Sequence, residues 1–145
     1  MAVTQIFNIA GSAMSAQSIR LNTIASNLAN AESASSSVDT TYRARHPVFK
    51  VAAVSGVVDP FAPQQGGPEA AGVSVAGILE SQAPLQPRYE PDHPMANEDG
   101  YVFYPNVNPV EEMANMISAS RSYQSSVELM NTAKDLAQRV LSLAE

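Results

Sequence analysis

The residues with the greatest potential for chemistry lie in and just after the proline-rich stretch of residues 83–94. Glu90, Asp92, His93 and Asp99 are close together in sequence and could be imagined as ligands of a metal ion. Their spacing matches neither the ligand pattern of a zinc site nor that of a calcium loop. Because charged residues in a proline-rich loop are normally solvated, we predict no metal site and no cofactor.

A hydrolytic enzyme would need a nucleophile with a base held beside it. The chain has seventeen serines and two histidines, His46 and His93, but it has no G-x-S-x-G elbow and no glycine-rich phosphate loop. Arg43, Arg45 and Lys50 are most simply a solvated strand face, and the remaining basic residues are scattered in a chain of net charge −6. The sequence therefore predicts neither an enzyme nor a nucleic-acid-binding protein.

The composition favours a protein that buries its surface against partners. Charged residues make up only 15% of the chain, against about 25% in an average soluble domain. Cysteine is absent, which excludes disulfides and thiolate metal sites. The apolar runs are too short for membrane insertion. No Lys or Arg precedes Arg20, so we expect no cleaved secretory signal peptide.

Proline divides the chain into three parts, because all ten prolines fall between Pro47 and Pro109. Residues 110–145 contain neither proline nor glycine, which predicts one long C-terminal helix. Asn108 can cap this helix, Pro109 suits its first position, and Glu111 stands where a capping-box acid reaches back. Such a helix is too long for the core of its own small domain.

The C-terminal helix carries apolar residues on two tracks. One heptad track consists of Met113, Met116, Ser120, Tyr123, Val127, Met130, Lys134, Ala137 and Leu141. A second stripe toward the end consists of Leu129, Ala133, Leu136, Val140 and Leu143. One track can face a helix of the same chain, and the other needs a partner outside it.

Residues 4–30 predict an N-terminal helix. Phe7, Met14, Leu21 and Leu28 recur every seven residues, with Ala10, Gln17, Ile24 and Ala31 between them. An ordinary amphipathic helix packing on its own domain is the alternative to a coiled-coil seam. Gly11 costs the helix about 1 kcal/mol, and its many Ser, Asn and Thr residues weaken it further, so we expect it to form on packing.

The middle of the chain predicts loops and short strands. A polar, serine-rich loop covers residues 31–41, and Tyr42–Val54 is a strand that Pro47 confines to an edge or breaks. Residues 59–72 form a loop, Val73–Leu79 a second strand with Gly77 as a possible bulge, and Tyr101–Tyr104 a third strand. Residues 83–94 are extended or turning. These strands amount to a small antiparallel sheet or hairpin.

Together these patterns predict a mainly α fold with a small β-rich middle segment, in which long N- and C-terminal helices pair as an antiparallel coiled coil. We expect residues 1–32 and 105–145 to form an inner coiled-coil domain. Residues 33–104 would form a linker and an outer β and loop segment.

Two stretches resemble bacterial flagellar rod and hook proteins. Residues 25–31 (ASNLANA), with Asn27 and Asn30, resemble the start of that axial family. The run YVFYPNVN resembles the end of the rod proteins of its short proximal-rod C type. The motif residues there are Pro105, Asn106 and Asn108, followed by Glu111, Arg121, Tyr123 and Lys134.

The resemblance implies a structural subunit of the basal-body rod in the periplasmic space, the drive shaft that surrounds an export channel. Its partners would be other copies of itself, other flagellar rod proteins and the flagellar type III export apparatus, which exports such chains without a cleaved signal peptide. The predicted assembly seam comprises Phe7, Met14, Leu21, Ile24, Leu28, Met113, Met116, Tyr123, Val127, Met130, Leu136 and Val140. The alternative is a soluble coiled-coil adaptor or export chaperone.

Overall fold

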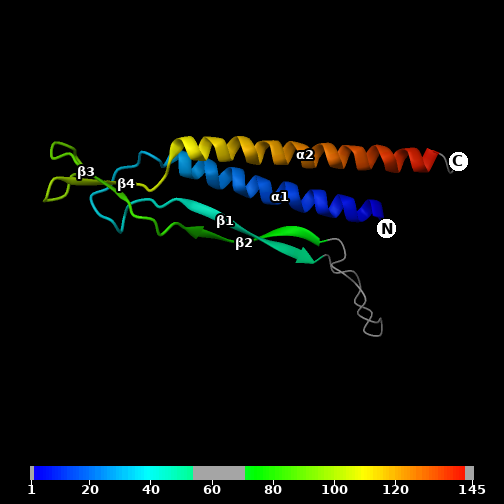
Figure 1. The fold of residues 1–145 in the computed structure, drawn as a ribbon, viewed down its shortest axis with the longest axis horizontal. Helices are drawn as coiled ribbons and strands as arrows, with labels where there is room; N and C mark the ends of the chain where they lie inside the picture. The colour runs from blue at the N-terminus through cyan, green and yellow to red at the C-terminus, as the bar shows by residue number, and fades with distance from the viewer. Residues whose placement is uncertain (1, 54–70, 143–145) are drawn as a thin grey trace, which may run out of the picture.

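The computed structural model describes residues 2–53 and 71–142, in which two long helices flank a β-rich middle (Figure 1). In chain order the elements are α1 (Ala2–Ala29), β1 (Arg45–Ala53), β2 (Ala71–Glu80), β3 (Gln86–Tyr89), β4 (Tyr101–Tyr104) and α2 (Pro109–Ser142). Two long helices around a small β middle were predicted, and this part of the fold prediction is confirmed.

Helix α2 begins as the sequence indicates. The Val110 N–H donates to Asn108 Oδ1 at 3.1 Å, so Asn108 caps the helix and Pro109 is its first residue. Among the described residues, Glu111 makes no hydrogen bond back to Asn108, and its part in a capping box is not observed. The helix then runs for 34 residues, which is about 51 Å at 1.5 Å per residue.

Helix α1 lies between α2 and the β1–β2 hairpin. It contacts both strands of the hairpin as well as α2, whereas α2 contacts no described helix or strand other than α1. In Figure 1 the two helices lie side by side, with both termini at one end of the molecule and the β3–β4 hairpin at the other. Contacts on both sides explain why apolar residues on several faces of α1 are at least half-buried.

Strands β1 and β2 form a two-stranded antiparallel sheet. Pro47 lies inside β1, which is possible because each strand of such a sheet has a free edge. The register shifts between Val48 and Phe49, which pair with Gly77 and Val75, so Ala76 is the extra residue of a bulge beside Gly77. Strand β2 begins at Ala71, so residues 71 and 72 belong to a strand and not to the predicted loop. The remainder of that loop and Val54 lie outside the described residues.

Strands β3 and β4 form a second antiparallel hairpin. Strand β3 includes Pro87 and was not predicted, because a short proline-containing segment becomes a strand only through its pairing with β4. The connection between them turns at Gly100, whose φ of 80° favours glycine. The middle segment therefore contains two small sheets, where the sequence indicated one.

Candidate functional site

The N-terminal half of the predicted seam lies along α1. Ile24 is buried, with 4% of its surface exposed, while Phe7, Met14, Leu21 and Leu28 are half-buried. Their partial exposure means that the chain alone does not cover this set of side chains.

The structure divides the C-terminal half of the predicted seam into two groups. Met116, Tyr123, Val127 and Met130 are half-buried. Met113, Leu136 and Val140 are 51%, 56% and 63% exposed. Because α2 contacts only α1 among the described elements, the second group is uncovered within the chain.

The side of α2 with the least exposure includes Glu112 and Ala119, which neither predicted track contained, and Ala133, which belonged to the second predicted stripe. Glu112, Ala119 and Ala133 are buried, and together with Met116, Tyr123 and Met130 they follow one another at intervals of four, three, four, seven and three residues, as on one side of a heptad helix. Ala119 and Ala133 come one residue before Ser120 and Lys134, the corresponding positions of the predicted track. A search for large apolar side chains at heptad spacing overlooks alanine. Its small size nevertheless lets two helices approach closely. The heptad spacing itself was the signal that could have found them.

Two polar groups accompany the contact between the helices. Arg20 Nη2 of α1 donates to Asn115 Oδ1 of α2 at 3.5 Å, which fixes these residues at the same level. Glu112 is only 5% exposed, and its Oε2 has no hydrogen-bond partner among the described residues. It lines a hollow of about 370 Å³ together with His46 and the two arginines Arg20 and Arg45.

The motif residue Asn27 is the centre of a joint between α1 and β1. It is fully buried, and its Nδ2 donates to the Arg45 carbonyl at 2.9 Å. Its Oδ1 accepts from the Arg45 N–H and from the Tyr42 hydroxyl, each at 2.9 Å. The Asn27 amide side chain thus pairs with both main-chain hydrogen-bonding groups of Arg45, the first residue of β1, as the main chain of a neighbouring strand would.

The motif residue Asn106 ties the other helix to the same joint. Its Oδ1 accepts from the Ala44 N–H at 2.8 Å, and its Nδ2 donates to the Ala83 carbonyl at 2.9 Å. The Ala44 carbonyl in turn accepts from the Ser81 N–H at 2.7 Å, and Pro105 beside Asn106 is buried. Two asparagines from opposite ends of the sequence therefore hold adjacent residues, Ala44 and Arg45. The structure brings Asn27 and Asn106 together at this one point.

The other motif residues lie outside this joint. Asn30 Nδ2 donates to the Ser26 carbonyl at 2.8 Å at the end of α1, and Asn108 caps α2. Tyr123 belongs to the half-buried side of α2. Glu111, Arg121 and Lys134 are exposed on α2.

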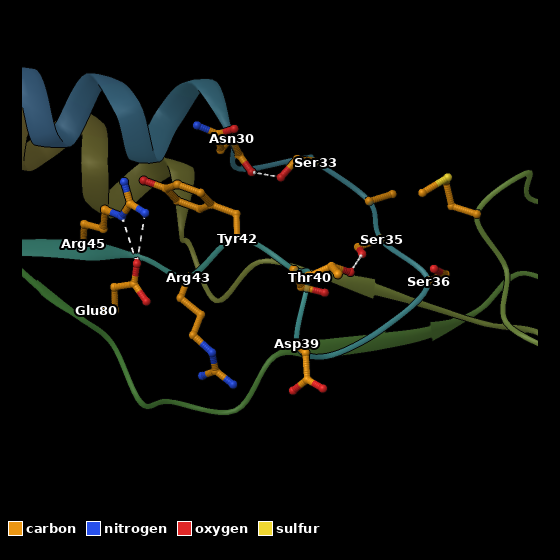
Figure 2. Close-up of a pocket in the computed structure, with 13 residues that line it drawn as sticks. Asn30, Ser33, Ser35, Ser36, Asp39, Thr40, Tyr42, Arg43, Arg45 and Glu80 are labelled. Atoms are coloured by element: carbon orange, nitrogen blue, oxygen red, sulfur yellow. Dashed lines mark hydrogen bonds and ion pairs between the residues drawn. The ribbon is translucent and has the colours of Figure 1, made fainter.

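A hollow of about 820 Å³ lies beside the serine-rich loop (Figure 2). It is lined by hydroxyls such as those of Ser33, Ser36 and Thr40, and by the ion pair in which Arg45 Nη2 lies 3.0 Å from Glu80 Oε1. The loop is held to β4 by two main-chain hydrogen bonds between Ser35 and Phe103, of 3.0 and 2.9 Å. These contacts support the loop and assemble no nucleophile with a base.

The acidic and histidine residues after the prolines do not converge. Within residues 2–53 and 71–142, no three His, Cys, Asp or Glu side chains are placed to hold a metal ion. His93 Nδ1 accepts from the Met95 N–H at 3.1 Å, which is a turn contact. Glu90 Oε2 accepts from the Tyr104 hydroxyl at 3.1 Å. Partial burial, and then this bond and the Glu90 charge, raise the pKa of Tyr104 above its ordinary value.

Neither helix is apolar enough over a sufficient length to cross a membrane, within the part of the chain that the structure describes. Exposed large apolar side chains lie along α2 and also on the β1–β2 hairpin. Because the predicted seam runs along the helices, we take the helices as the candidate site.

Two family models of known proteins match the two ends of the chain, where the helices lie. Residues 7–32 match a family model described as flagella basal body rod protein. Residues 98–143 match a model described as flagellar basal body rod FlgEFG protein C-terminal.

Relatives match along the whole chain. A protein of Salmonella typhimurium named flagellar basal-body rod protein FlgC is 48% identical over 145 residues, covering all of both chains. The proteins of the same name from Yersinia enterocolitica and Borreliella burgdorferi are 47% and 32% identical. The alignments cover all of this chain, and 100% and 99% of those relatives.

Proposed function

This chain belongs to the FlgC family of flagellar basal-body rod proteins, and we propose that its two terminal helices are the part that polymerises. As a member of that family it is a structural subunit of the rod and not an enzyme. Nothing in the comparisons favours the alternative of a soluble adaptor or export chaperone.

The observation that carries the proposal is the mismatch between the apolar residues of α2 and its contacts. Leu129, Leu136 and Val140 are each more than half exposed, yet α2 has a single described neighbour, α1. Burying one such side chain contributes about 1.5–3 kcal/mol. Contacts of this kind, repeated between subunits in a head-to-tail manner, give an open helical array.

We propose that α1 and α2 pair as an antiparallel coiled coil in an inner domain of residues 1–32 and 105–145. The four-and-three spacing of Glu112, Met116, Ala119 and Tyr123 supports this pairing. Residues 33–104 would form the outer segment, which the joint at Asn27 and Asn106 holds in a defined orientation. The partners are other copies of this chain and other rod proteins.

We further propose that the flagellar type III apparatus exports the chain without a cleaved signal peptide and that it assembles in the periplasm. Gly11 and the frequent Ser, Thr and Asn residues of α1 weaken the helix in isolation. A helix that is weak alone is easily kept unfolded during export, and its ordering then accompanies binding to neighbouring subunits.

Substitutions in the seam test the proposal. Leu28→Asp and Val127→Asp each place a charge among half-buried residues, and each should abolish incorporation into basal bodies and swimming in soft agar. His93→Ala, which removes only a turn contact, is the control and should swim normally. Wild-type swimming by the Val127→Asp strain would contradict the proposed role of the helices.

A further inference from the structure

The exposed apolar residues of α2 form two groups at different positions along the helix axis. Val110, Met113 and Ile117 are 75%, 51% and 56% exposed and make up what we term the early stripe. Leu129, Leu136 and Val140 are 51%, 56% and 63% exposed and make up the late stripe. Between them the exposed positions are polar, including Arg121, Gln124 and Ser125.

Apart from Val140, the two stripes lie on opposite flanks of the side of α2 that faces α1. Val140 follows the buried Ala133 by seven residues, so it continues the side that faces α1 past the beginning of α1. Successive helical residues point about 100° apart. Ile117 directly follows Met116, which is on the least exposed side, whereas Leu136 directly precedes Ala137, which is on the same side. One stripe is therefore turned about 100° in one direction from α1, and the other about 100° in the opposite direction.

The late stripe also extends past the beginning of α1. Because Arg20 lies beside Asn115 in an antiparallel pair, Ala2 is level with about residue 133 of α2. Figure 1 shows the end of α2 reaching beyond the N-terminus of α1. Leu136 and Val140 thus have no described element of their own chain beside them.

We propose that the late stripe of one copy packs on the early stripe of a second copy of this chain, with the two α2 helices parallel. The inference rests on the proposed self-assembly of the helices and names the surfaces that carry it. The stripes correspond in spacing, because Val110 and Ile117 are seven residues apart and so are Leu129 and Leu136. Ile117 then lies beside Leu136 of the second copy.

This pairing determines the kind of array that results. Residues 117 and 136 differ by nineteen positions, so neighbouring α2 helices are displaced along their axis by roughly 28 Å. Since the stripes lie on opposite flanks, each copy offers one stripe to the copy on either side. The contact is heterologous, and it leaves a free stripe at each growing edge.

Disulfide cross-linking tests the contact, because the natural chain has no cysteine. Basal bodies would be isolated from strains carrying Ile117→Cys, Leu136→Cys or both in one chain, and oxidised with copper phenanthroline. On a non-reducing gel the double variant should give dimers and longer ladders, and each single variant should give monomer only. Glu128→Cys with Leu136→Cys is the matched control, because Glu128 is exposed on the flank of Ile117 but about three turns farther along, and it should give monomer.

Two results would overturn the inference. Self-cross-linking of either single variant would indicate a two-fold contact, and the absence of dimers in an assembled double variant would mean that another protein covers the stripe. Absence of the wild-type chain from basal bodies would instead refute the proposed function itself.

A charge pair provides a second measurement that does not depend on cysteine. Ile117→Glu and Leu136→Lys both change exposed positions, so the helix pair within the chain is preserved. Each alone should lower the amount of subunit in basal bodies at least about tenfold. The double variant should recover to within about threefold of the natural chain, and a double variant no better than the singles would count against the contact.

Discussion

The joint at Asn27 leads to the most quantitative prediction. Asn27→Ala removes the acceptor of the Arg45 N–H and of the Tyr42 hydroxyl, and the donor to the Arg45 carbonyl, each at 2.9 Å. A buried group left without a partner costs about 1–3 kcal/mol. The Arg45 side chain is 47% exposed, so water reaches part of this strand, and we take the lower part of that range for its main-chain groups. The expected total loss is about 2–4 kcal/mol.

A loss of this size changes the opening equilibrium of the joint by roughly 30- to 900-fold. Hydrogen–deuterium exchange of peptides covering residues 42–48, measured in isolated basal bodies, reports that opening directly. The Arg45 amide should exchange faster in the Asn27→Ala subunit by a factor in this range.

Asn22→Ala is the matched control for Asn27→Ala. Asn22 lies on the exposed face of the same helix, and its side chain makes no hydrogen bond among the described residues. Both substitutions raise the helix propensity of α1 by the same few tenths of a kcal/mol, roughly 0.5. If Asn27→Ala altered exchange no more than Asn22→Ala, the joint would not be what holds β1 to α1.

Two further predictions concern close packing. Ala119→Leu places extra methylenes at a fully buried position, which should cost about 1–3 kcal/mol and lower the amount of subunit in basal bodies, while Ser118→Leu at the exposed neighbouring position should not. Gly100→Ala should destabilise the β3–β4 hairpin by about 1–2 kcal/mol, because φ is +80° and the new Cβ would lie 2.9 Å from Tyr89 Cε2. Faster hydrogen exchange in residues 86–104 measures this loss, and Gly77→Ala, with open space around the added methyl, is the control.

The helices could be predicted closely from the sequence because their signals are local. Asn108 and Pro109 mark the start of α2 as the structure has it, and the absence of proline before Pro47 allows α1. The β3 strand could not be predicted in this way. Its residues become a strand only through pairing with β4, across a turn that depends on Gly100.

The contacts of the motif residues Asn27 and Asn106 also could not be predicted from the sequence. Asn27 binds a main chain eighteen positions away, and Asn106 binds Ala44, sixty-two positions away. The resemblance to flagellar rod and hook proteins identified both residues as motif residues. It did not indicate which groups they bind, because those groups are distant in the sequence. Ala119, on the half-buried side of α2, was missed for a different reason, since it contributes through its small size.

The composition of the buried core supports the proposed link between assembly and order in this chain. Among the described residues, the buried apolar side chains are mostly alanines, such as Ala10, Ala16 and Ala119, with Ile24 and Val102 among the few larger ones. Alanine contributes much less on burial than the roughly 1.5–3 kcal/mol of a leucine or valine, and the larger residues between the helices, such as Met116 and Tyr123, are only half-buried. Other large apolar side chains of α2, such as Leu136 and Val140, are more than half exposed, and α1 is the one described element that contacts α2. We therefore expect a chain arranged in this way to gain its strongest stabilisation in the assembled rod, while the polar joint holds β1 to α1.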